Sequence, residues 1–79
     1  MPKNIPSLKP KELIRFLERG GCTFYREGKG DHRLYVRYLR DKKRVVPIDM
    51  GARELSPVYV LRIFRQFGFS DDEIEGLLE

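Results

Sequence analysis

The sequence has one cysteine and one histidine among its 79 residues. A single cysteine cannot form a disulfide within the chain, so we expect a fold without covalent cross-links. Cys22 opens a predicted strand beside hydrophobic residues, and we expect a packed thiol there. Together with His32 it cannot supply the three or four side-chain ligands of a zinc site. We therefore expect no cofactor and no metal within one chain, while a metal shared between two chains stays open.

Long apolar segments are also missing. No run approaches the roughly 20 apolar residues of a membrane-spanning helix, and the first residues, MPKNIPSLKPK, lack the apolar segment of a secretion signal. We therefore expect a cytoplasmic protein that does not associate with a membrane. The length and the 41% hydrophobic content are those of a small globular unit. We expect residues 1–79 to form a single domain around one core.

Acidic residues are scarce outside the C-terminal end. The chain has 16 Lys and Arg against 12 Asp and Glu, a net charge of +4, and five of the acids lie in residues 71–79. Residues 1–70 keep 16 bases and seven acids, a formal charge of +9. Such a surface favours a polyanion, because each neutralised phosphate releases counterions. The charge distribution predicts a nucleic-acid partner, although many small basic domains bind no specific polyanion.

Residues 8–21, LKPKELIRFLERGG, have the pattern of an amphipathic helix. Leu13, Phe16 and Leu17 recur at helical spacing among charged residues. Pro10 suits the first turn of the helix, and the paired glycines suit its end.

The centre of the sequence predicts three strands. Residues 22–27 and 32–38 flank the turn GKGD and indicate an antiparallel hairpin. Residues 39–43 are expected to form a charged loop, and residues 44–50 a third strand. Pro47 cannot donate to a strand ladder, which favours an edge position or an irregular end.

The second predicted strand alternates between two sets of side chains. One set is His32, Leu34, Val36 and Tyr38, and the other is Arg33, Tyr35 and Arg37. We expect the first set to face the helices, with His32 at the rim of the core and partly in water. The second set then lies on the outer face, where cations between aromatic rings can hold phosphates and stack bases. Ordinary cross-strand pairing on a solvated face explains the same pattern equally well.

Helical periodicity returns in residues 52–68, where Ser56 is a suitable N-cap and Pro57 a suitable first residue. Residues 70–79 open with a serine and a glutamate in capping-box spacing and predict a short last helix. The chain is thus expected to fold as α+β, with both main helices on one face of a three-stranded antiparallel sheet.

The order of several short motifs resembles the HicA toxins. After LKPKELIRFLERGG come an aromatic strand, glycine, an acidic residue, histidine and RLY, then VVP, glycine, ELSP and a helix ending in RQFGFS. The resemblance runs from Leu8 to Ser70. It implies a double-stranded-RNA-binding-domain-like fold, in agreement with the order α-β-β-β-α and the short extra C-terminal helix that the residues predict. It also implies the toxin of a type II toxin–antitoxin system, an endoribonuclease that cleaves messenger RNA and is inhibited by a HicB-type antitoxin.

The resemblance also implies a catalytic residue. In HicA toxins the histidine after the glycine turn is catalytic, so the role falls to His32, with Gly28 and Gly30 as the turn glycines. Many relatives carry a second histidine after the Val-Pro of the third strand, where this chain has Ile48-Asp49-Met50. Whether Asp49 replaces that histidine stays open.

The chemistry of RNA cleavage suits these residue types. RNA supplies its own nucleophile, the 2′-hydroxyl, so no metal is needed if a group titrating near neutrality moves the proton and cations stabilise the phosphate. Histidine titrates near pH 6.5. We expect Lys29, Arg33 and Arg26 to bind the phosphate beside His32. Two further residues complete the predicted RNA-binding set, Tyr35 and Arg37, on a face equally suited to docking of the antitoxin.

Two other classes of function stay open. A non-catalytic RNA-binding module on the same fold would use the basic strand face, and His32 would only close the hairpin. A protein-interaction domain without a nucleic-acid role would bind its partner with an affinity that hardly changes with salt.

Overall fold

The computed structural model describes residues 4–79, and residues 1–3, which the single-domain prediction included, lie outside the described residues. Its elements are α1 (Pro10–Arg19), β1 (Thr23–Glu27), β2 (His32–Leu39), β3 (Lys42–Asp49), α2 (Pro57–Gln66) and α3 (Asp71–Leu78). The α+β prediction and the double-stranded-RNA-binding-domain-like order α-β-β-β-α with an extra helix are confirmed.

The helix boundaries follow from local capping. Ser56 accepts a hydrogen bond from the backbone N–H of Tyr59 at the start of α2. At the start of α3, Ser70 and Glu73 form the predicted capping box, in which each side chain accepts from the other residue's backbone N–H. These bonds satisfy N–H groups that the first turn of a helix leaves without partners.

The three strands form an antiparallel sheet in the order β1-β2-β3. β2 and β3 pair from His32 opposite Asp49 to Leu39 opposite Lys42. The loop predicted over residues 39–43 is therefore shorter than expected, because pairing continues to a two-residue turn. Pro47 lies in β3, which is an edge strand, as its missing N–H requires. The other edge strand, β1, has a bulge between Phe24 and Arg26.

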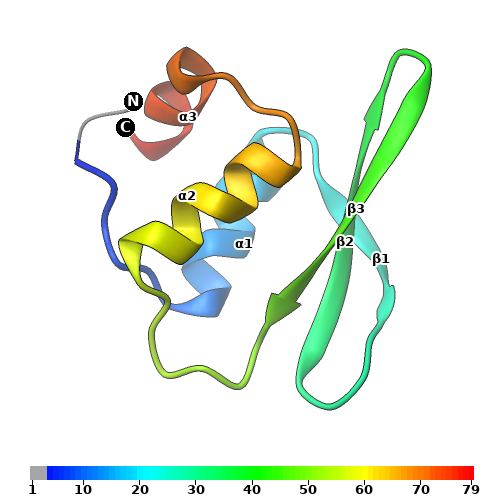
Figure 1. Ribbon diagram of the computed structural model, residues 1–79, viewed down its shortest axis with the longest axis vertical. Coiled ribbons are helices and arrows are strands. Elements are labelled where there is room, and N and C mark those ends of the chain that lie inside the picture. The colour runs from blue at the N-terminus through cyan, green and yellow to red at the C-terminus, as the bar shows by residue number, and fades with distance from the viewer. Residues whose placement is uncertain (1–3) are drawn as a thin grey trace.

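The sheet and the helices form two layers. α1 and α2 lie on one face of the sheet, and the other face has no helix against it (Figure 1). The core between the layers combines helix residues with one face of the sheet. Its members include Leu13, Leu17, Phe64 and Phe67 from the helices and Tyr35, Val46 and Ile48 from the strands.

The face of β2 that contacts the helices is the opposite of the predicted one. Tyr35 is 5% exposed and belongs to the core, with Val46 directly across from it on β3. The expectation that the His32, Leu34 and Val36 side faces the helices is therefore wrong. Both sides of β2 carry apolar residues, so its alternation does not settle the orientation, and packing against the helices does. The side with His32 forms the helix-free face of the sheet, which we call the open face.

Arg37 contributes to the interior side of the sheet. Its guanidinium lies 3.9 Å from the centre of the Phe69 ring, donates to the carbonyl of Phe67 at 3.0 Å and pairs with Glu73 at 3.5 Å. Arg44 on β3 likewise donates to the carbonyl of Gln66, at 3.2 Å. Both arginines therefore reach the C-terminal end of α2, where the helix dipole favours positive charge.

Cys22 is a packed thiol, as expected. It is 1% exposed and belongs to the core. Burial raises the pKa of the Cys22 thiol to about 11, and the positive charge of Arg37 offsets part of this effect. The thiol is therefore protonated at neutral pH and is a poor nucleophile.

The two faces of β2 predict a large loss of stability when one tyrosine ring is removed and almost none when another is removed. Tyr35→Ala should lower the free energy of unfolding by ~3–5 kcal/mol, the usual cost of truncating a buried aromatic residue. Tyr38 is 66% exposed on the open face, so Tyr38→Ala should change the free energy of unfolding by less than ~0.5 kcal/mol. Urea unfolding followed by circular dichroism measures both. Equal losses in the two variants would contradict the assignment of the faces.

Candidate active site

The turn between β1 and β2 places His32 at the surface. The backbone N–H of Gly28 donates to the carbonyl of His32 at 2.9 Å, and the N–H of His32 donates to the carbonyl of Lys29 at 3.0 Å. Gly30 has a φ of 58°, in the left-handed region that favours glycine. A Cβ on Gly28 would lie 2.9 Å from a methyl carbon of Leu34. The turn thus favours glycine at Gly30 through its backbone conformation and leaves little room for a side chain at Gly28.

The imidazole of His32 is exposed on the open face. Its Nδ1 lies 3.3 Å from the carbonyl oxygen of Lys29. A carbonyl oxygen can only accept a hydrogen bond, so this contact favours a proton on Nδ1. In the neutral ring Nε2 then carries the lone pair and is the atom that can accept a proton.

Asp49 is the cross-strand neighbour of His32. Directly opposite residues have Cβ atoms about 4.5–5.5 Å apart, on the same side of the sheet. One carboxylate oxygen of Asp49 accepts from the N–H of Gly51 at 2.9 Å, which holds the side chain at the end of β3. The structure therefore pairs an acidic residue with His32 across the strands, at the position where the sequence raised the question of a second functional group.

Two of the three predicted phosphate-binding residues lie on the His32 side. Arg26 is exposed and pairs with Leu34, which shares the open face with His32, and exposed Lys29 lies in the turn itself. Arg33 points to the other side of the sheet. It pairs with Glu27 at 3.4 Å, and its guanidinium lies 5.9 Å from the centre of the Phe24 ring.

The other two predicted RNA-binding residues lie on the helix side of the sheet. Tyr35 is buried, and its ring contacts that of Phe24 edge to face. Arg37 is half-buried and holds the bonds to Phe67 and Glu73 described above. Neither side chain is placed to contact a strand of RNA that lies on the open face.

The open face carries three other aromatic and cationic residues that the predicted RNA-binding set did not include. Tyr38 and Tyr25 are 66% and 39% exposed, and Lys43 lies opposite Tyr38 on β3. The ammonium of Lys43 donates to the Tyr25 hydroxyl at 3.1 Å and lies 4.8 Å from the centre of its ring. The alternation of β2 already put Tyr38 on the side of His32. The β1 bulge that accompanies Tyr25 has no signal in the sequence.

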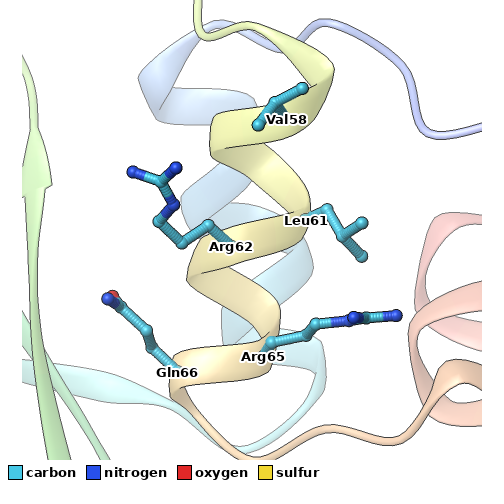
Figure 2. A pocket seen from close by; sticks show the side chains of 5 residues that line it. All are labelled: Val58, Leu61, Arg62, Arg65 and Gln66. Carbon is cyan, nitrogen blue, oxygen red and sulfur yellow. The ribbon is translucent and has the colours of Figure 1, made fainter.

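A separate hollow of about 400 Å³ lies on the outer surface of α2. Figure 2 shows its lining side chains, with Arg65 directed towards α3 and Arg62 on the other side of the helix. Arg65 pairs with Asp71 at 3.1 Å. Because α2 covers the opposite face of the sheet, this hollow is not part of the surface around His32.

Neither a metal centre nor a membrane span is found in residues 4–79. No three or more His, Cys, Asp and Glu side chains of this part of the chain are grouped so that they could hold a metal ion. No helix within the same range is long and apolar enough to cross a membrane.

Comparison with protein families gives a match over most of the chain. Residues 10–69 match the model of a family described as "HicA toxin of bacterial toxin-antitoxin". The matched segment begins with α1 and includes the whole sheet, the turn before His32 and α2, and it ends before α3. Comparisons with curated proteins and with solved structures give no match.

The contact between Lys43 and Tyr25 predicts a measurable change in the pKa of Tyr25 when Lys43 is replaced. The hydrogen bond from Lys43, and then its charge, lower the pKa of the Tyr25 hydroxyl. Lys43→Gln should therefore raise this pKa towards its ordinary value of about 10. The neighbouring variant Lys42→Gln, whose residue faces the other side of β3, is the matched control and should leave it unchanged. Tyrosine ring carbon shifts in an NMR titration report both, and an unchanged Tyr25 in Lys43→Gln would contradict the contact.

Proposed function

The chain belongs to the HicA toxin family of bacterial toxin–antitoxin systems, and we propose that it acts as the toxin by metal-independent cleavage of messenger RNA in the cytoplasm. The observation that carries the proposal is an exposed imidazole, His32, whose Nδ1 is held by a backbone carbonyl and whose neighbours in the β1–β2 hairpin include the exposed cations Arg26 and Lys29. Family membership supports the toxin role, and the open face supports RNA as the molecule acted on.

In the proposed reaction His32 is the general base. Nε2 takes the proton of a ribose 2′-hydroxyl, and the 2′-oxygen attacks the adjacent phosphorus. The bond from phosphorus to the 5′-oxygen breaks, leaving a 2′,3′-cyclic phosphate on one product. The 5′-oxygen of the other product takes a proton from the imidazolium or from water. An imidazole can both accept and donate a proton, as the two steps require.

The neighbouring side chains have separate roles in this proposal. Arg26 and Lys29 stabilise the negative charge that builds up on the phosphate oxygens. Tyr25 and Tyr38 stack on bases farther along the bound strand, towards the β2–β3 turn, and Lys43 binds a phosphate there. Asp49 acts as a positioning residue, because it is the cross-strand partner of His32 and its carboxylate is fixed by the N–H of Gly51.

Removal of the imidazole tests the reaction. The purified protein should cut a single-stranded RNA in the presence of EDTA. His32→Ala should cut it at least ~100-fold more slowly, the typical contribution of a general acid–base group, and should still bind it. Gel analysis of end-labelled RNA measures cleavage, and fluorescence anisotropy measures binding.

The same experiment includes its controls. Arg62→Gln changes an exposed residue of α2 outside the site and should cleave like the unchanged protein. His32→Ala, purified identically, also reports any contaminating nuclease. Equal cleavage by the unchanged protein and His32→Ala would remove His32 from the mechanism, and loss of cleavage in EDTA would remove metal independence. Binding without cleavage under any condition would favour the non-catalytic RNA-binding module.

We also propose that a HicB-type antitoxin inhibits the protein by covering the open face. Tyr38 and Val58 are exposed to a similar extent, 66% and 68%, but lie on opposite layers. Tyr38→Asp should weaken binding of the cognate antitoxin at least tenfold, and Val58→Asp should leave it nearly unchanged. Calorimetry measures both affinities. The reverse result would move the antitoxin to the outer surface of α2.

A further inference from the structure

A basic hollow at the start of α1 adjoins the proposed active site. It has a volume of about 420 Å³, and its lining includes Lys9, Lys11, Arg15, Arg53, Glu12 and Met50. We infer that this hollow binds phosphates of the same RNA strand that reaches His32, so that the RNA-binding surface continues from the open face around the end of the sheet. The inference rests on the proposed function and adds a second contact region to it.

The backbone around the hollow is firmly held. Leu8 and Leu55 exchange two backbone hydrogen bonds, of 3.1 and 2.7 Å, and both side chains are buried. This bridge joins the segment before α1 to the segment before α2. It therefore brings Lys9, next to Leu8, close to Arg53, two residues before Leu55. The cations of the hollow thus come from two parts of the sequence that the fold ties together.

The positive charge of the hollow is largely uncompensated. All four of its cationic side chains are exposed. Its one carboxylate, Glu12, accepts the backbone N–H of Lys9 at 2.8 Å and so caps α1. In the part of the chain that the structure describes, the ion pairs involve Arg33, Arg37 and Arg65 and none of these four cations. Four cations against one acid, gathered in a concave surface, attract a polyanion.

The hollow adjoins the turn that carries His32. Met50, which lines the hollow, donates its N–H to the carbonyl of Asp31 at 2.9 Å, and Asp31 immediately precedes His32. The Asp31 side chain also packs closely against Gly51. In Figure 1 the β1–β2 turn, the end of β3 and the start of α1 lie at one end of the molecule. One strand of RNA at that end can contact both regions.

The hollow on α2 provides the comparison. It also contains two arginines, Arg62 and Arg65, but Arg65 is paired with Asp71 and the hollow lies across the helix layer from the open face (Figure 2). Removal of charge there should have little effect on RNA bound at His32. A simple dependence on net charge would instead make every arginine equivalent.

The test uses His32→Ala protein, so that RNA stays intact. Arg15→Gln and Arg53→Gln are combined in one variant, and Arg62→Gln and Arg65→Gln, from the hollow on α2, in a matched variant with the same net charge. The probes are single-stranded oligouridylates of 3 and 15 nucleotides. Anisotropy at several salt concentrations measures binding of the longer probe, and NMR shifts of Tyr25 and Tyr38 measure binding of the shorter one.

The hollow variant should bind the 15-nucleotide RNA about tenfold more weakly than its His32→Ala parent. Its plot of log affinity against log salt should be flatter by about 1.4, because single strands lose about 0.7 per phosphate contact. The matched variant should stay within about threefold of the parent, and the trinucleotide should bind both equally. Equal weakening in the two variants, or none in the hollow variant, would overturn the inference.

Cleavage separates this inference from the proposed reaction. With His32 present, the hollow variant should show a higher KM for the longer RNA and an unchanged kcat. If the unchanged protein binds RNA without cleaving it, the proposed reaction fails, while the difference in binding between the two variants still decides the role of the hollow. Failure of the parent to bind either RNA would overturn both.

Discussion

The packing of Tyr35, Val46 and Ile48 against the helices determines which side of the sheet carries His32. Side chains alternate along a strand, so once Tyr35 and its partner Val46 enter the core, His32 and Asp49 must lie on the open face. A shift of one residue in the register would turn every side chain of the strand over. The accessibility of the imidazole therefore follows from three buried contacts on the other side of the sheet.

Some arginines stabilise the fold and others remain free in solvent, and the face of the sheet on which each lies decides which. Arg37 faces the helix layer, where the Phe69 ring and the carbonyl of Phe67 meet its guanidinium. Its bond to Glu73 also links β2 to the first turn of α3. The charge and the hydrogen bonds of the half-buried Arg37 therefore stabilise the fold and are not available to RNA. Arg26, on the same sheet but on the open face, keeps its side chain in solvent. The net charge of the sequence therefore overstates the number of cations that RNA can reach.

The sequence predicts the elements better than it predicts their faces. Local signals were sufficient for the capping of α2 and α3 and for the glycine turn, because capping residues and left-handed backbone conformations involve neighbours in the chain. The orientation of β2 depends on distant residues, since Val36 and Tyr35 are both apolar enough to be buried and both are in fact below 6% exposure. That ambiguity moved Tyr35 and Arg37 into the predicted RNA-binding set. The β1 bulge is a feature of the pairing, and no residue type in β1 indicates it.

The acidic residues that cluster at the C-terminal end of the sequence also lie apart from His32 in the structure. Four of the eight residues of α3 are acidic, and α3 lies at the end of the molecule away from the β1–β2 turn (Figure 1). Salt screens exposed charges beyond about 8 Å at physiological ionic strength, so this separation acts mainly when a polyanion approaches. It favours arrival at the end that carries His32 and disfavours arrival at α3. Once a strand is bound, its affinity depends on direct contacts with phosphates, which is why the positions of individual cations around the turn matter more than the total charge.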